Sequence, residues 1–205
     1  MSPTARKAVN FIVYQVTWLL GVIAAARGQA ALGCLILAAA IAVHLWLAPR
    51  RAPEVRLVLA ALLVGLLWES LLVSFGLFRY ASGNFAAGIA PYWILALWAQ
   101  FATTLNLSLA WLKGRPLLGV AFGLLGGPLA YYAGFKLGAL DSPDLTLALA
   151  LQGFGYAVFV PLFCALAVRW NGFAGVMGDA AAARPATSRP AAAAALSMAR
   201  ESSRA

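Results

Sequence analysis

One carboxylate stands in the middle of an otherwise apolar stretch, and its position is the first to suggest chemistry. Residues 57–78 read LVLAALLVGLLWESLLVSFGLF, with Glu69 as their single charged side chain. About 20 apolar residues span the hydrocarbon core of a bilayer, so this stretch is expected to form a transmembrane helix. Glu69 lies roughly 18 Å along that helix, close to the midplane. A carboxylate at this depth costs about 2.5–3.5 kcal/mol on insertion scales. We therefore expect Glu69 to face protein or water, or to be protonated.

Neutral polar and aromatic side chains in the other apolar blocks are the candidate neighbours of Glu69. We predict an intramembrane polar cluster made of Glu69, Gln15, Trp18, Trp68, Gln100, Asn106, Tyr131 and Gln152. Two interpretations stay open for Glu69. Either it is a neutral carboxylic acid that donates one hydrogen bond between helices, or it binds a proton or a substrate. Gln100 shares a helix face with Thr103 and Thr104, which either forms interhelical hydrogen bonds or lines a polar cavity.

The remaining reactive residue types do not form a recognisable catalytic or metal-binding pattern. His44 is the only histidine, and no apolar block holds a second carboxylate, so paired-acid catalysis lacks a partner. Cys34 and Cys164 lie in separate apolar blocks without the spacing of metal ligands. We therefore predict no catalytic residue, no metal and no cofactor, while enzymatic activity stays open. The net charge of +9 comes from basic residues scattered over turns and the C-terminal tail, so nucleic acid is not expected as a partner.

The composition places these residues in a membrane protein. Of 205 residues, 63% are apolar and 10% are charged, whereas soluble domains carry roughly 25% charged residues. We predict an all-α bundle of six transmembrane helices within residues 1–172, with spans at about 8–26, 30–47, 57–78, 92–112, 117–137 and 145–168. Residues 173–205, rich in Ala, Pro and Arg, are predicted to form a disordered cytoplasmic tail.

Proline and the basic residues add local detail to this prediction. Gly127-Pro128 falls inside the fifth span and predicts a helix kink, which serves either packing or a broken-helix binding site. With both termini in the cytoplasm, twelve of the fifteen Lys and Arg lie on the cytoplasmic side. A cleaved secretory signal is the alternative for the first block, but that block is longer than a usual signal core.

Several short motifs follow one another along the predicted spans. They are Asn10-Phe11 with Tyr14-Gln15 and Trp18, Trp68-Glu69, Pro91 with Trp93, Trp98 and Phe101, and Gly127-Pro128 with Tyr131 and Gly134. On these residues the segment 10–168 resembles a small family of polytopic bacterial inner-membrane proteins that carries a domain-of-unknown-function label. The resemblance implies a multi-pass protein of the bacterial inner membrane. In their genomic setting, members of this family resemble partners of fatty-acyl-modifying enzymes. The resemblance therefore also implies a lipid-related role, but it identifies no catalytic residue.

Three function classes are consistent with these observations. The first is an accessory protein of membrane-lipid or fatty-acyl metabolism, with the lipid bilayer and a lipid-modifying enzyme as partners. The second is a small proton-linked transporter that uses Glu69. The third is an intramembrane enzyme. We expect the first, and the three differ most clearly in the role that they assign to Glu69.

Overall fold

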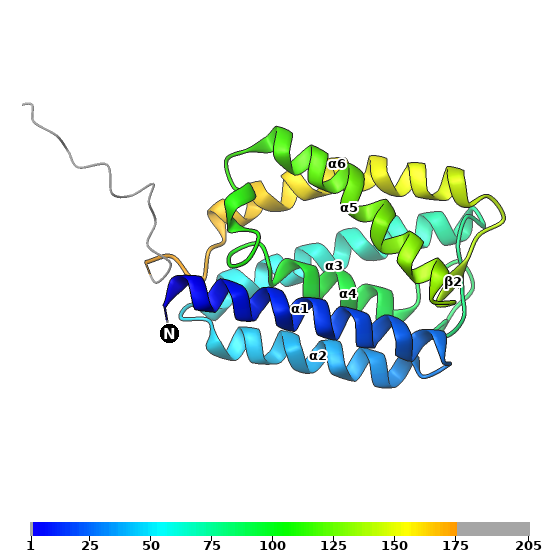
Figure 1. Cartoon of the computed structure of the whole chain (residues 1–205), viewed down its shortest axis with the longest axis horizontal. Helices are drawn as coiled ribbons and strands as arrows, with labels where there is room; N and C mark the ends of the chain where they lie inside the picture. Colours follow the sequence, from blue (N-terminus) through cyan, green and yellow to red (C-terminus); the bar gives the residue numbers. More distant parts are fainter. Residues whose placement is uncertain (1, 176–205) are drawn as a thin grey trace, which may run out of the picture. The chain divides into compact units, whose positions relative to one another are not determined.

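The described part of the chain, residues 2–175 of a computed structural model, is built from six α-helices (Figure 1). These are α1 (Pro3–Ala26), α2 (Ala30–Leu47), α3 (Arg51–Ser74), α4 (Tyr92–Ala102), α5 (Pro116–Lys136) and α6 (Leu145–Arg169). A short 3-10 helix, η1, covers Ala110–Leu112. Two-residue strands β1 (Arg79–Tyr80) and β2 (Leu140–Asp141) pair in antiparallel fashion. The all-α prediction is confirmed for these residues.

Five of the helices, all except α4, are long and apolar enough to cross a membrane. Their outer surfaces carry large apolar side chains such as Leu35 and Leu67, which are 68% and 64% exposed. By contrast, the interior contains buried polar residues: His44, Glu54, Glu69, Gln100, Thr103, Thr104, Asn106 and Gln152. An apolar exterior around a partly polar interior suits a protein whose surroundings are lipid. These features indicate a multi-pass membrane protein.

The fourth apolar block differs from its prediction. A single helix was expected over 92–112, but α4 ends at Ala102 after 11 residues, and turns follow before η1. The hydroxyls of Thr103 and Thr104 donate hydrogen bonds to the backbone carbonyls three residues before them, at 2.7 and 2.6 Å. Such local hydrogen bonds compete with the helix. The amides of both threonines also bond three residues back, which tightens the last turn and ends the helix.

Asn10 on α1 stabilises the irregular segment that follows α4. Its side-chain amide donates to the carbonyl of Thr103 at 3.2 Å, and its oxygen accepts from the Ser108 hydroxyl at 2.6 Å. Most residues of this segment are buried in protein. Non-helical backbone at membrane depth is tolerated only in such a setting, because lipid cannot satisfy its polar groups.

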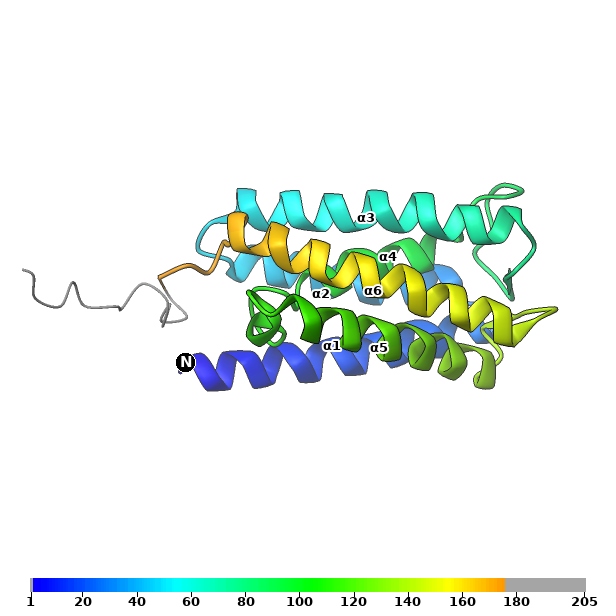
Figure 2. The ribbon, with the colours of Figure 1, turned by 90° about the horizontal axis from the view of Figure 1, so that it is seen from above.

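The helices pack around α4, which contacts α1, α2 and α3 (Figures 1 and 2). α5 packs against α6 through a face of glycines spaced four residues apart, including Gly123 and Gly127. A Cβ added to Gly127 would lie 2.7 Å from the ring of Tyr156, so only glycine permits this approach. α5 continues as one helix through Pro128. Gly127, the other residue of the predicted kink, permits the close contact with Tyr156.

The compact unit formed by these elements ends at Phe173, and residues 174–175 belong to a second unit. Phe173, the first residue of the predicted tail, is buried and packs against the ring of His44. From residue 176 onward the predicted tail lies outside the described residues.

Candidate functional site

Glu69 is fully buried and accepts hydrogen bonds from four side chains on four different elements. Its Oε1 accepts from Trp98 Nε1 on α4 at 3.0 Å, from the Tyr131 hydroxyl on α5 at 2.5 Å and from Gln152 Nε2 on α6 at 3.0 Å. Its Oε2 accepts from the Tyr80 hydroxyl on β1 at 3.2 Å. We call these five residues the Glu69 cluster. Because it joins α3 to three other helices and to the β1 strand, the cluster fixes how these elements meet.

The direction of two of these hydrogen bonds is set by chemistry. An indole N–H can only donate, so Trp98 donates to Glu69. Trp68 donates its indole N–H to Gln152 Oε1 at 2.7 Å, which places the Gln152 amide nitrogen toward Glu69. An ionised carboxylate accepts about four such bonds. The geometry thus supplies donors to Glu69, and a neutral carboxylic acid could donate only to the oxygens of Tyr80 or Tyr131.

Tyr80 reaches Glu69 from outside the helices. Pairing of β1 with β2 folds the loop after α3 back over the bundle, and this places Tyr80 in the interior. Burial raises the pKa of Tyr80 well above its usual range, and the neighbouring Glu69 carboxyl raises it further. The Tyr80 hydroxyl therefore keeps its proton and serves as a hydrogen-bond donor.

A second buried carboxylate, Glu54, lies in the first turn of α3. Its Oε1 accepts from Asn106 Nδ2 and from the backbone N–H of Gly172, both at 2.7 Å. Its Oε2 lies 2.9 Å from His44 Nε2. Lys113 Nζ in turn donates to Asn106 Oδ1 at 2.9 Å. These five residues, the Glu54 cluster, join α2 and α3 to the segments that follow α4 and α6.

The structure divides the eight residues of the predicted cluster among several places. Glu69, Tyr131 and Gln152 meet directly, and Trp68 joins them through Gln152. Gln15 and Trp18 instead line a pocket. Gln100 donates to the Thr17 hydroxyl, and Asn106 belongs to the Glu54 cluster.

Six residues of the two clusters lie outside the predicted polar cluster: Tyr80, Trp98, His44, Glu54, Lys113 and Gly172. Tyr80 lies between two predicted spans, and Trp98 is part of the family motifs but not of the predicted cluster. Glu54 lies before the predicted span 57–78, whereas α3 begins at Arg51 and includes it. An acidic residue directly after Pro53 is typical of a first helical turn, and this signal could have placed Glu54 inside α3.

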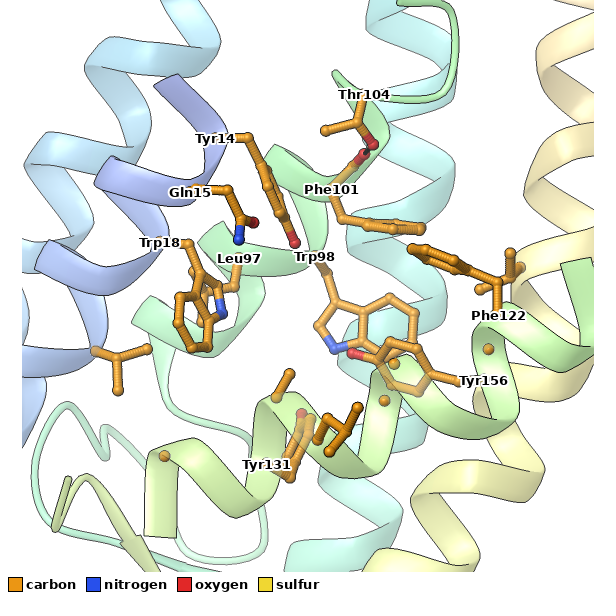
Figure 3. A pocket seen from close by; sticks show the side chains of 18 of the residues that line it. Tyr14, Gln15, Trp18, Leu97, Trp98, Phe101, Thr104, Phe122, Tyr131 and Tyr156 are labelled. Carbon is orange, nitrogen blue, oxygen red and sulfur yellow. Dashed lines mark hydrogen bonds between the residues drawn. The ribbon is translucent and has the colours of Figure 1, made fainter. Parts of the chain in front are cut away.

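A pocket of about 340 Å³ lies between α1, α4, α5 and α6 (Figure 3). Aromatic side chains dominate its walls: Phe11, Tyr14, Trp18, Trp93, Trp98, Phe101, Phe122, Tyr131 and Tyr156. Trp98 and Tyr131 belong both to this wall and to the Glu69 cluster. Glu69 itself is not among the described residues that line the pocket, so these two side chains stand between the carboxylate and the cavity.

The pocket reaches the apolar surface of the protein between α1 and α5. Phe11 on α1 and Leu129 on α5 both line it and are 51% and 66% exposed. Of the described residues that line it, none is Asp, Glu, Lys, Arg or His. Nor do the described residues contain a group of three or more His, Cys, Asp or Glu side chains that could hold a metal ion. The site is thus an uncharged cavity that is open to the hydrophobic face of the bundle.

Comparison with known proteins places most of this bundle within one family model. Residues 7–162 match the model described as "Protein of unknown function (DUF2878)". This range includes most of α1, all of α2 to α5, the buried carboxylates Glu54 and Glu69, and every described pocket-lining residue. No curated protein and no solved structure shows significant similarity to the chain.

Proposed function

The chain belongs to the family of unknown function DUF2878, and from this premise we propose that it is a membrane-embedded lipid-binding protein. In this proposal it acts as an accessory to membrane-lipid or fatty-acyl metabolism and presents a bound lipid to a lipid-modifying enzyme. It resides in the bacterial inner membrane with both termini in the cytoplasm. The observation that carries the proposal is the uncharged aromatic pocket open between α1 and α5.

The size, lining and position of the pocket support a lipid as its occupant. Ligand pockets commonly measure about 300–1,000 Å³ and are lined by apolar and aromatic side chains. Here the 340 Å³ cavity lies beside two helices that are apolar enough to cross a membrane. Lipid chains surround such helices on their outer faces, so a lipid can enter sideways between α1 and α5 without crossing water.

The environment of Glu69 favours this proposal over proton-linked transport. A transporting carboxylate must exchange its proton with water on each side of the membrane. Glu69 has no exposed surface, and its two oxygens receive bonds from four side chains. The arrangement is that of a structural junction. The described residues that line the pocket include no acidic side chain, which weakens the case for an intramembrane enzyme.

Photolabelling of the full-length protein in membranes tests the proposal. The probe is a fatty alcohol with a photoreactive diazirine in its alkyl chain, and labelled peptides are identified by mass spectrometry. We expect labels on α1 between residues 11 and 22 and on α5 between residues 122 and 134. An added Cβ on Gly126 meets nothing closer than 3.7 Å, so Gly126→Leu adds its side chain to the pocket wall without a backbone clash.

We expect Gly126→Leu to reduce the labelling about tenfold, equivalent to roughly 1.4 kcal/mol of binding free energy. Ala121→Leu is the matched control, because Ala121 is an exposed residue of the same helix that does not line the pocket. It should label like the wild-type protein. Equal labelling of the two variants would show that the probe sits on the outer lipid surface, and the proposal would fail.

A further inference from the structure

We infer that the pocket takes an uncharged lipid whose head group carries a carbonyl or hydroxyl oxygen, held by Tyr14, Gln15 and Trp18. This inference rests on the proposed function and adds the chemistry of the head group. The three residues lie within two turns of α1 and line the pocket from one side. Figure 3 shows their side chains directed toward the space in front of Trp98.

The polar groups of these three side chains have no hydrogen-bond partner among the described residues; Tyr14 and Trp18 are half-buried, and Gln15 is exposed. By contrast, the side-chain nitrogens of Gln100 and Gln152 on α4 and α6 are bonded to other helices. A polar group without a partner is costly in an apolar environment, where water is scarce. Three neighbouring groups of this kind on one pocket wall therefore indicate a ligand that supplies the missing partners.

The hydrogen-bonding capacity of the three side chains defines the head group. The Trp18 indole can only donate, and the Gln15 amide nitrogen carries two further donors. The ligand must therefore offer an acceptor oxygen. The Tyr14 hydroxyl and the Gln15 amide oxygen can also accept, so a hydroxyl head group is satisfied as well as a carbonyl.

The absence of charge from the wall excludes an ionised head group in this place. No acidic, basic or histidine side chain is among the described lining residues. A phosphate or carboxylate would have to lose its water without gaining a counter-charge, which is unfavourable in a medium of low dielectric constant. The ligand is therefore of the class that includes fatty alcohols, aldehydes and esters.

The apolar tail of such a lipid matches the rest of the cavity. The lining residues on α1 extend from Phe11 to Val22, which corresponds to about 16 Å along the helix axis. Aromatic rings from the other three helices, including Phe101, Phe122 and Tyr156, form the facing wall. With its oxygen beside Gln15, an extended alkyl chain can lie along the remaining seven residues to Val22, about 10 Å of the helix axis.

Competition against the photoreactive fatty alcohol tests the head-group assignment on the full-length protein. Three competitors share one chain length: an alkanol, an alkylphosphonate that stays ionised at neutral pH, and an alkane. We expect the alkanol to compete about tenfold better than either of the others, because two or three hydrogen bonds distinguish it. Equal or stronger competition by the phosphonate would overturn the inference while the proposed function stands. If the probe does not label the pocket at all, both are overturned.

The variant Gln15→Leu tests whether Gln15 binds the oxygen of the head group. This variant should lower the advantage of the alkanol over the alkane about fivefold, since it removes one of the partners. Competition by the alkane should stay unchanged, which shows that the pocket is intact. Val16→Leu is the control, because Val16 is exposed on the same helix and does not line the pocket. An unchanged ratio of alkanol to alkane in Gln15→Leu would refute the assignment.

Discussion

Two buried glutamates lie on the same helix, and their surroundings differ. Glu54 and Glu69 are separated by fifteen residues of α3, or about 22 Å along its axis. Glu54, in the first turn, lies beside His44 and accepts from Asn106, which also contacts Lys113. Glu69, deep in the same helix, is bonded to neutral donors alone among the described residues.

The difference shows how depth in a membrane protein determines the partners of a carboxylate. Near the end of a bundle, long basic side chains can keep their charged heads close to water. Deep in the bundle, a second charge would bring its own desolvation cost, whereas an indole, an amide or a phenol brings much less. The Glu69 carboxylate is therefore stabilised by hydrogen bonds from four neutral side chains: Tyr80, Trp98, Tyr131 and Gln152.

Both clusters join distant segments, and neither Glu54 nor Glu69 is among the described residues that line the pocket. The Glu69 cluster joins α3 to α4, α5, α6 and β1, and the Glu54 cluster joins α2 and α3 to the segments after α4 and α6. In our account the buried charges hold the bundle together, and the uncharged pocket carries the function.

The largest effect is expected from removing the acceptor at the deeper site. Glu69→Leu leaves Trp98 and Gln152 as buried donors without their partner. Each such donor costs about 1–3 kcal/mol, so the free energy of unfolding should fall by about 2–6 kcal/mol. Unfolding in mild detergent, followed by tryptophan fluorescence, measures this. Leu67→Ala on the exposed face of α3 is the control and should change stability by less than about 1 kcal/mol. A loss for Glu69→Leu no larger than that of the control would contradict a structural role.

The matching change at the end of the helix should have a smaller effect. Glu54→Leu also removes a buried acceptor, but Asn106 keeps its bond to the Trp170 carbonyl at 2.8 Å. We therefore expect a loss of about 1–3 kcal/mol, mainly from the orphaned N–H of Gly172. The same detergent unfolding experiment compares the two variants. A greater loss for Glu54→Leu than for Glu69→Leu would reverse the comparison.

The smallest effect is expected from Tyr80→Phe, which removes one of the four donors to Glu69. At neutral pH the loss should be about 0.5–1.5 kcal/mol. The pKa of Tyr80 is raised on folding, so above about pH 10 the unfolded chain releases the tyrosine proton while the folded protein keeps it. Stability from this group therefore falls as pH rises. The difference in unfolding free energy between wild type and Tyr80→Phe should shrink above that pH, and a constant difference would argue against a buried, protonated Tyr80.

Hydropathy was sufficient to predict the helical framework of this chain. The observed α5, Pro116–Lys136, is shifted by one residue from the predicted span 117–137, because Pro116 and the turn after Lys136 mark both ends. From the cost of a carboxylate in lipid, Glu69 was predicted to face protein or water or to be protonated, and in the structure it is buried in protein. The break after Ala102 could not be predicted in this way, because a buried turn and a buried helix have similar hydropathy.

The partners of the buried charges depended on contacts between distant parts of the chain. Tyr80 reaches Glu69 only because Arg79 pairs with Asp141 across the two short strands. Gly172 reaches Glu54 from beyond the last helix. Nothing in the local pattern of either segment encodes such a pairing. The pocket could not be predicted either, although two of its lining residues, Gln15 and Trp18, belong to the predicted polar cluster.

The central claim is that Glu69 holds the bundle together while the uncharged pocket binds lipid. Photolabelling by the diazirine fatty alcohol, compared between Glu69→Gln and Gly126→Leu at equal amounts of folded protein, tests this claim most directly. The account predicts that Glu69→Gln lowers the unfolding temperature yet is labelled on α1 and α5 like the wild type, whereas Gly126→Leu loses about nine-tenths of the label. Loss of labelling in folded Glu69→Gln, with labelling retained in Gly126→Leu, would contradict it and assign the function to the carboxylate.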